Sequence, residues 1–201
     1  MDINLKNLTP DIRYLDDMKK VCYDQEWFAS AENFELYFMY RGIEKKNGIR
    51  YDITVIPANM LGNEFVKTKG HYHIGKYQEV YTVLEGQAIY LMQKKKIDDE
   101  IEDIYVVKAK KGDVVVIPSD YGHITINPSS IEDLKMANWI DSDCKSDYSL
   151  FEKFQGACYY YLATENGASW VKNEHYKNIP DLRFEEPLKE VPKDLDFLKA
   201  S

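Results

Sequence analysis

Residues 70–86 read GHYHIGKYQEVYTVLEG, and residues 112–127 read GDVVVIPSDYGHITIN. These two stretches contain three of the four histidines in the chain. His71 and His73 are separated by one residue on a predicted strand, so their rings point to the same face of a sheet. Glu79 follows after a turn that contains a glycine, and it opens the next predicted strand. The first stretch therefore predicts two imidazoles and a carboxylate on neighbouring strands.

The second stretch adds a third imidazole on a distant strand. Three nitrogen ligands and one carboxylate oxygen suit a divalent transition metal such as Fe, Mn, Ni or Zn, and they leave coordination positions open for a substrate. We therefore expect one divalent metal ion per subunit, with Fe²⁺ as the first choice. The candidate ligands are His71, His73, Glu79 and His123.

The central part of the chain has the pattern of an all-β protein. Short runs rich in β-branched and aromatic residues alternate with turn signals such as Glu85-Gly86 and Lys111-Gly112. Many short strands separated by turns are typical of a sandwich or a barrel. We expect a barrel core over residues 34–162 of a single domain that occupies residues 1–201. The predicted strands are Glu35–Tyr40, Ile49–Pro57, Glu64–His73, Glu79–Leu84, Gln87–Gln93, Ile104–Val107, Asp113–Pro118, His123–Asn127 and Lys135–Ile140.

The two ends of the chain have different patterns. Near the N-terminus, Thr9-Pro10-Asp11 resembles a helix start and is followed by apolar residues at helical spacing, which predicts a short helical segment. The aromatic-rich run Phe151–Trp170 is expected to return to the sheet around a turn at Glu165-Asn166-Gly167. Residues 180–201 are rich in proline and charge, and they predict a tail on the surface or on a neighbouring subunit. The N-terminal apolar residues are Ile12, Leu15, Met18 and Val21.

Composition excludes several classes of partner. The 26 Lys and Arg residues against 34 Asp and Glu residues give a formal charge of −8, so there is no basic surface for nucleic acid. No apolar run approaches the roughly 18 residues that span a bilayer, so no membrane partner is expected. The three cysteines are odd in number and widely scattered, which indicates reduced thiols and a cytoplasmic protein.

The two quoted stretches resemble the two motifs of the cupin superfamily. Gly70-His71-x-His73-x5-Glu79-x6-Gly86 matches the first motif with a longer loop before the glutamate. The run from Gly112 through Pro118 and His123 to Asn127 matches the second, with Asp120 where the family usually has glycine. The resemblance implies a jelly-roll-like, double-stranded β-barrel, with the helical segment and the tail as extensions.

A finer resemblance, over roughly Tyr14 to Lys177, is to the cupin-type glucose-6-phosphate isomerases of archaea and some bacteria. Thr68-Lys69-Gly70-His71-Tyr72-His73 is similar to the family signature, and Glu79-Val80-Tyr81 matches its Glu-x-Tyr. Thr54, 14 residues before Thr68, and the pair Asp147-Tyr148 also fall on family positions. Two positions depart from the family: Ser146 replaces a histidine, and an upstream aromatic appears as Trp139 only after a one-residue insertion.

The resemblance implies a metal-dependent isomerase that interconverts glucose 6-phosphate and fructose 6-phosphate as a homodimer. It assigns catalysis to Glu79, which would carry the proton, with Tyr81 and Tyr148 orienting the substrate or a ligand. The substrate and its phosphate would contact four residues, and Lys67 and Lys69 would add positive charge nearby. The four substrate-binding candidates are Thr54, Thr68, Gly70 and Trp139.

Two other functions fit a cupin with this ligand set, because the fold hosts many activities. An iron-dependent cupin dioxygenase needs a similar metal site but a pocket for an oxidisable substrate. A non-catalytic sugar-binding cupin needs the pocket alone. The threonines suited to phosphate favour the isomerase over the first alternative, and the complete ligand set disfavours the second.

Overall fold

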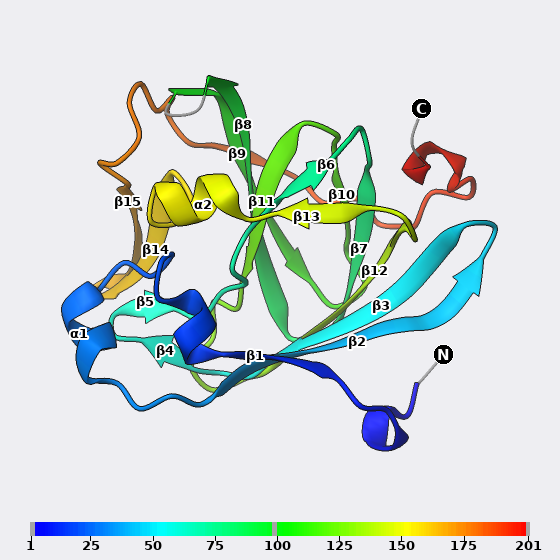
Figure 1. Ribbon diagram of the computed structural model, residues 1–201, viewed down its shortest axis with the longest axis horizontal. Coiled ribbons are helices and arrows are strands. Elements are labelled where there is room, and N and C mark those ends of the chain that lie inside the picture. Colours follow the sequence, from blue (N-terminus) through cyan, green and yellow to red (C-terminus); the bar gives the residue numbers. More distant parts are fainter. Residues whose placement is uncertain (1–2, 98–99, 200–201) are drawn as a thin grey trace.

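The computed structural model describes residues 3–97 and 100–199 (Figure 1). These residues form 16 strands, two short α-helices and three short 3-10 helices. The predicted all-β architecture is confirmed: two large, mainly antiparallel sheets lie face to face, and two small sheets lie beside them. The sheets do not close into one continuously hydrogen-bonded barrel within the described residues.

The larger sheet has six strands, all antiparallel, in the order β1-β2-β3-β12-β7-β10. Its central strands alternate between a face toward the second sheet and an outer face, as the period of two requires. The strands are β1 (Asp11–Tyr14), β2 (Glu35–Lys46), β3 (Ile49–Ile56), β7 (Glu79–Glu85), β10 (Val114–Ile117) and β12 (Leu134–Asp141).

The second sheet has the order β11-β8-β9-β16, and only the pairing of β16 with β9 is parallel. It packs against the larger sheet through apolar and aromatic side chains, such as Tyr90 against Tyr81 with ring centroids 5.3 Å apart. The strands are β8 (Gln87–Ile97), β9 (Glu100–Lys110), β11 (Tyr121–Ile126) and β16 (Arg183–Glu185).

Two small sheets and the helices complete the structure. One small sheet pairs β13 (Lys145–Asp147) with β6 (Tyr72–Ile74), and the other has the order β15-β14-β5-β4. The expected return around Glu165-Asn166-Gly167 is confirmed by the β14–β15 hairpin. The remaining elements are β4 (Met60–Leu61), β5 (Glu64–Phe65), β14 (Tyr159–Thr164), β15 (Gly167–Lys172), α1 (Gln25–Ser30), α2 (Ser149–Lys153), η1 (Leu5–Asn7), η2 (Leu15–Met18) and η3 (Asp196–Leu198).

The N-terminal segment differs from the helix that its spacing predicted. Asp11–Tyr14 is a strand at the edge of the larger sheet, and the helical turn that follows it is the short 3-10 helix η2. The apolar residues Leu15, Met18 and Val21 are nevertheless fully buried. A short apolar pattern does not distinguish a helix from a strand, and the unpaired edge of β2 decides the outcome here. The helix of this region is α1, which begins after the N-cap Asp24.

The predicted single strand Glu64–His73 is also wrong. It divides into β5 and β6, and the chain between them pairs with β11 through isolated bridges, Lys67 with Ile126 and His71 with His123, instead of a continuous strand. Gly70 causes the division, because its φ of 82° lies in the left-handed region that interrupts a strand.

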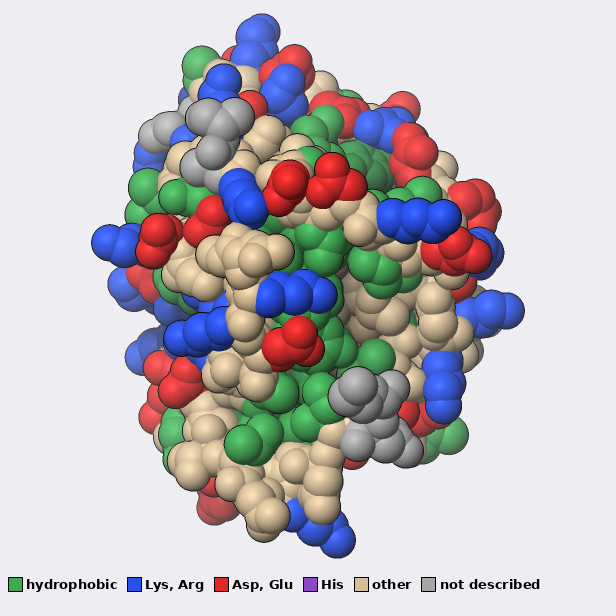
Figure 2. Space-filling model, turned by 90° about the vertical axis from the view of Figure 1, so that its right-hand side faces the viewer, with side chains coloured by type: hydrophobic (Ala, Val, Ile, Leu, Met, Phe, Trp, Pro, Cys, Tyr) green, Lys and Arg blue, Asp and Glu red, His purple; other side chains and the backbone are tan. Residues whose placement is uncertain are grey.

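The C-terminal segment lies along the surface and adds β16 beside β9. Near the end of the chain, η3 inserts Leu198 into a small apolar cluster with Ile49, Val80 and Val114 on the outer face of the larger sheet. Figure 2 shows the side of the molecule where η3 lies, with apolar side chains between charged ones. Among the described helices, none has the length and apolar character needed to cross a membrane.

Candidate metal centre

A pocket of about 680 Å³, including its mouth, opens between the two large sheets. Three neighbouring strands contribute every second residue to its wall: residues 37, 39 and 41 of β2, residues 50, 52 and 54 of β3, and residues 136, 138 and 140 of β12. The register aligns these residues in rows, because Asp52 is opposite Asn138 and Asn138 is opposite Tyr81 of β7. Because side chains alternate between the two faces of a strand, residues that are far apart in the sequence line the same cavity.

The four predicted ligands converge at one end of this pocket. One potential ligand atom from each of His71, His73, Glu79 and His123 lies within 4.8 Å of the others. Oε2 of Glu79 lies 3.4 Å from Nε2 of His73 and 3.4 Å from Nε2 of His123. The bridge between His71 and His123 holds two of the rings together, with centroids 4.5 Å apart.

The unpaired atoms of this cluster fit a metal ion. Nε2 of His73, Oε2 of Glu79 and both ring nitrogens of His123 are buried without a hydrogen-bond partner among the described residues. Buried polar atoms are otherwise almost always paired, because an unsatisfied one costs about 1–3 kcal/mol. A divalent cation would satisfy these atoms together, and three imidazoles with one carboxylate form a suitable donor set.

The charge states of the cluster follow from its burial. Burial, and then the nearby His123 and His73, lower the pKa of His71 well below its usual value, and burial also lowers the pKa of His123. For His73, burial opposes the charged form but the adjacent Glu79 outweighs it, so that the pKa is raised. Burial would raise the pKa of Glu79, but His123 and His73 outweigh it and lower that pKa. Metals bind neutral imidazoles and ionised carboxylates, so the lowered pKa values of His71, His123 and Glu79 favour binding, whereas the raised pKa of His73 opposes it.

The second carboxylate oxygen of Glu79 is held by protein. Nδ2 of Asn138 donates to Oε1 of Glu79 at 2.6 Å, and both side chains are buried. The Tyr81 ring packs against His123, and burial and then the charge of Glu79 raise the pKa of Tyr81 well above its usual value. Glu79 is therefore fixed so that Oε2 faces the histidines.

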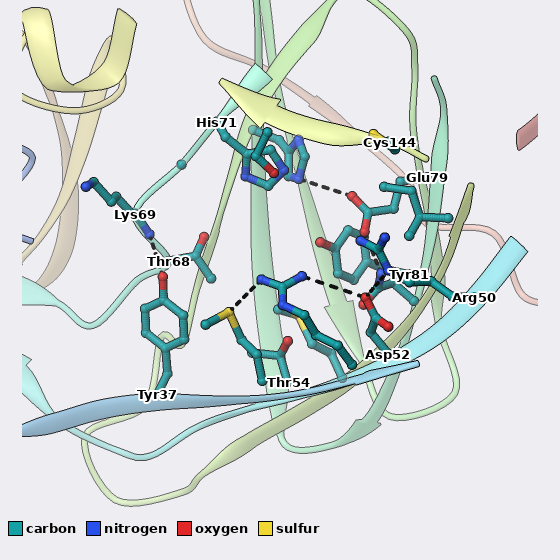
Figure 3. A pocket seen from close by; sticks show the side chains of 18 of the residues that line it. Tyr37, Arg50, Asp52, Thr54, Thr68, Lys69, His71, Glu79, Tyr81 and Cys144 are labelled. Carbon is teal, nitrogen blue, oxygen red and sulfur yellow. Dashed lines mark hydrogen bonds and ion pairs between the residues drawn. The ribbon is translucent and has the colours of Figure 1, made fainter. Parts of the chain in front are cut away.

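The predicted phosphate donors line the same pocket on the side away from Glu79 (Figure 3). Oγ1 of Thr68 accepts a hydrogen bond from the Thr125 N–H at 2.9 Å, which leaves the hydroxyl proton for a ligand. Thr54 lies on β3, and the Tyr37 hydroxyl accepts from the Lys69 N–H at 3.2 Å. These hydroxyl groups face one part of the cavity.

Gly70 lies between the threonine side and the metal side of the pocket. A Cβ at this position would lie 2.5 Å from Ile124 and 2.7 Å from Phe151, so a larger residue would force these side chains apart. Asp120, where the cupin pattern usually has glycine, has a φ of 70° and so keeps the left-handed conformation of that turn.

Tyr148 and Ser146 line the pocket mouth, whereas Trp139 does not. Trp139 lies on the opposite face of β12, where its ring packs on Tyr51 at 4.8 Å and under Nζ of Lys46 at 4.3 Å. The prediction that Trp139 contacts substrate is therefore wrong, because the alternation of the strand turns Asn138 and Ile140 inward instead.

The expectation that Lys67 adds charge to the pocket is also wrong. Its side chain is buried away from the pocket, in an ion pair with Glu64, and it donates to the Val21 carbonyl at 2.8 Å. Lys69 does line the pocket, but its ammonium is paired with Glu152 at 2.6 Å.

Sequence reasoning missed the polar wall of the pocket. The strand Ile49–Ile56 alternates polar and apolar residues, and such alternation is usually read as a solvent-exposed polar face. In a barrel, polar residues in this alternating pattern can instead line a cavity, so the pattern itself could have indicated the polar wall. The missed residues are Tyr37, Arg41, Arg50, Asp52 and Asn138.

The chain is similar to a family of known proteins. A family model described as glucose-6-phosphate isomerase (GPI) matches residues 15–179. The chain is 31% identical over 130 residues to the glucose-6-phosphate isomerase of Thermococcus litoralis, a match that spans 61% of this chain and 65% of that protein, just under two thirds of its length. It is 26% identical to the glucose-6-phosphate isomerase of Pyrococcus horikoshii over 83% of this chain and 88% of that protein.

Solved structures with a similar fold include an oxalate decarboxylase–formate complex from Lactobacillus farciminis, with a TM-score of 0.42 and 20% identity over 54% of this chain and 29% of that one. The cupin domain of Cnp3 from Schizosaccharomyces pombe has a TM-score of 0.39 and 11% identity over 63% of this chain and 74% of that one. The family model, which covers well over half of the sequence, decides the assignment: the chain belongs to the glucose-6-phosphate isomerase (GPI) family.

Proposed function

We propose that this protein is a metal-dependent isomerase that interconverts glucose 6-phosphate and fructose 6-phosphate. One observation carries the proposal. Three histidines and a glutamate meet at one side of a pocket, with unpaired buried ligand atoms on His73, Glu79 and His123, and hydroxyl donors lie on the other side. An open-chain sugar phosphate has matching chemistry, with two vicinal oxygens near one end and a phosphate at the other.

The metal would be held by His71, His73, Glu79 and His123. When bound, a divalent cation supplies Lewis-acid stabilisation of the negative charge that develops on O1 and O2 during isomerisation. Fe²⁺ is the ion we propose first, and Mn²⁺, Ni²⁺ and Zn²⁺ suit the same donors.

Glu79 is the residue we propose to move the proton between C1 and C2. The other carboxylate on the pocket wall, Asp52, is already paired, since Oδ2 lies 2.9 Å from Nε of Arg50 and Oδ1 accepts from the Gly42 N–H at 2.6 Å. Tyr81 and Tyr148 would orient the substrate from opposite sides of the cluster, since the first packs on His123 and the second on His71.

The phosphate would be bound by the hydroxyl groups of Thr54 and Thr68 and by the backbone N–H at Gly70. A glycine lets an anion approach the main chain closely. Hydrogen bonds to a phosphate are charge-assisted and so stronger than those to a neutral group.

The test is a conversion assay on purified protein, treated with chelator and then reloaded with Fe²⁺ or Mn²⁺. Fructose 6-phosphate and glucose 6-phosphate should interconvert, with activity lost on chelation and restored by metal. Oxygen consumption with an organic substrate, and no isomerisation with any metal, would instead identify a dioxygenase. Sugar phosphate binding without turnover would identify a binding protein.

We also propose a cytoplasmic homodimer. Cys22, Cys144 and Cys158 are free thiols, which agrees with a reducing compartment. Among the described strands, β1 forms one edge of the larger sheet, and a second subunit would cover this edge. Light scattering should give about twice the chain mass of 23.5 kDa, and a monomer mass at micromolar concentration would exclude the dimer.

A further inference from the structure

We propose that Arg41 binds the phosphoryl group of the substrate and sets the preference for phosphorylated over unphosphorylated sugars. This inference rests on the proposed function, and it adds a charged residue to a phosphate subsite made otherwise of neutral donors. Four observations support this inference. Arg41 lies on the pocket wall, the buried Asp52 fixes the backbone beside it, its terminal nitrogens have donors free for a ligand, and its ion pair with Asp11 is exposed and weak.

Arg41 ends the row of alternating residues on the pocket side of β2, and a bulge begins at this point of the strand. The pairing of β2 with β3 is regular up to Tyr40 and resumes at Glu44, and Gly42 between them has a φ of 64°. Bulges re-aim side chains and are frequent beside functional sites. Arg41 follows Met39 on the pocket side of β2, and Met39 is opposite Thr54 of β3, so Arg41 lies on the same wall as the proposed phosphate donors.

A buried carboxylate holds this bulge. Asp52 accepts from the Gly42 N–H at 2.6 Å and lies 2.9 Å from Nε of Arg50 and 3.8 Å from a terminal nitrogen of Arg41. Its side chain is only 5% exposed. A buried charge is costly unless it is paired, so Asp52 fixes both the backbone turn and the guanidinium beside it.

Arg41 differs from the other cations of the pocket in its free donors. Lys69 is paired with Glu152 at 2.6 Å, and Arg50 is engaged by Asp52 and by the Ser142 carbonyl at 3.2 Å. Among the residues that the structure describes, the terminal nitrogens of Arg41 have only a thioether contact to Met39 at 3.2 Å and the 3.8 Å approach to Asp52. Of the described cations that line the pocket, Arg41 has the most donor capacity left for a ligand.

The chemistry of the site favours a phosphate as that ligand. Tyr37, Thr54 and Thr68 supply neutral donors, and none of them offsets the double negative charge of a phosphoryl group. A guanidinium presents a planar fork that matches two phosphate oxygens. The remaining strong partner of Arg41 is Asp11, at 3.1 Å from Nε, and the Asp11 side chain is 67% exposed. An exposed pair of this kind is weak, so a phosphate can displace it.

The test is calorimetric titration of the metal-loaded protein with 6-phosphogluconate and with gluconate. We expect Arg41→Gln to weaken 6-phosphogluconate binding roughly 10- to 100-fold, the range for a hydrogen bond to a charged group, and to leave gluconate binding unchanged. Arg41→Lys should recover part of the loss, because it keeps the charge without the fork. Asp11→Asn should tighten 6-phosphogluconate binding by up to about fivefold, because the phosphate no longer competes with the Asp11 carboxylate for Arg41.

Arg183→Gln is the matched control. Arg183 is 44% exposed against 43% for Arg41, its Nε also lies 3.1 Å from an aspartate, and it lies outside the pocket. This variant should bind both ligands as the wild type does.

Equal weakening of both ligands by Arg41→Gln would place Arg41 at the metal end and overturn the proposal, and so would unchanged binding of both. A wild type that binds 6-phosphogluconate no better than gluconate would overturn the phosphate subsite itself, and with it this role of Arg41. A wild type that prefers 6-phosphogluconate, with Arg41→Gln unaffected, would leave the proposed function standing and remove only Arg41.

Discussion

The two sides of the pocket are built in different ways. The metal side consists of four candidate metal ligands from two short stretches of sequence, and one potential ligand atom of each lies within 4.8 Å of the others. The polar side is assembled from alternate residues of β2, β3 and β12, which are spread over more than 100 positions of the chain. The candidate metal ligands can therefore be located from short sequence motifs. The polar side depends on how the strands of a whole sheet are paired.

The two sides should therefore respond differently to substitution. Variants on the metal side should change metal content and turnover together. Variants on the polar side should change the recognition of phosphate and leave the metal bound.

The largest effect is expected from His123→Ala. It removes one imidazole from a buried four-ligand set, and metal affinity should fall by more than the roughly 10- to 100-fold typical of residues that only support a ligand. Activity should be lost with the metal. Elemental analysis and the conversion assay measure both. His175→Ala is the control, because His175 is outside the cluster and hydrogen bonds to Gln155; undiminished metal in the His123 variant would contradict the site.

Glu79→Gln should separate turnover from metal binding. The amide keeps the shape and one ligating oxygen but cannot take up a proton, so kcat should fall by about 10²- to 10⁴-fold. Metal affinity should fall less than in His123→Ala. If Glu79→Gln loses metal as completely as His123→Ala and regains full activity at high metal concentration, then Glu79 acts only as a metal ligand and does not move the proton.

Asn138→Ala tests the residue that fixes Glu79. Loss of the 2.6 Å hydrogen bond should lower kcat by roughly 10- to 100-fold and weaken the metal modestly, as expected for a residue that orients a ligand. KM for fructose 6-phosphate should change little. Trp139→Phe on the opposite face of the same strand is the control. Equal behaviour of the two variants would show that the hydrogen bond has no role in turnover.

Thr68→Val should have the most limited effect, because it should weaken the recognition of phosphate and leave the metal bound. The substitution keeps β-propensity and removes one hydrogen bond to a charged group, worth about 1.5–3 kcal/mol, so kcat/KM should fall roughly 10- to 100-fold. It also removes the acceptor of the Thr125 N–H, a loss that should lower the stability of the fold and not the preference for phosphate. Metal content should not change. Inhibition by a phosphorylated sugar acid should weaken, and inhibition by its unphosphorylated form should not. Equal weakening of both inhibitors would place Thr68 away from the phosphate.

Features of the fold and the site that depend on residues close in sequence could be predicted from the sequence, whereas features that depend on strand pairing could not. The metal cluster was predictable because spacing within a strand places His71 and His73 on one face, and the second motif supplies His123. The strand at Asp11–Tyr14 was not, because pairing with β2 overrides a pattern that also fits a helix. Trp139 was misplaced by one residue, and in a strand one residue reverses the face.

The polar wall needed the three-dimensional structure. Arg41 lies beside a bulge whose position no local pattern specifies, and Asp52 is recognisable as the support of that bulge only when β2 and β3 are paired. The division of Glu64–His73 has the same origin, because Gly70 turns the chain where the side chains of Ile124 and Phe151 leave no room for a Cβ.

The central claim is that one metal ion in this cluster supports the interconversion of the two sugar phosphates. The most direct test is to titrate metal-stripped protein with Fe²⁺ and to follow the conversion of fructose 6-phosphate to glucose 6-phosphate together with bound metal. We expect activity to rise in proportion to bound metal and to saturate at one ion per chain. Full activity in the stripped protein, or an ion that binds without restoring any conversion, would contradict the account.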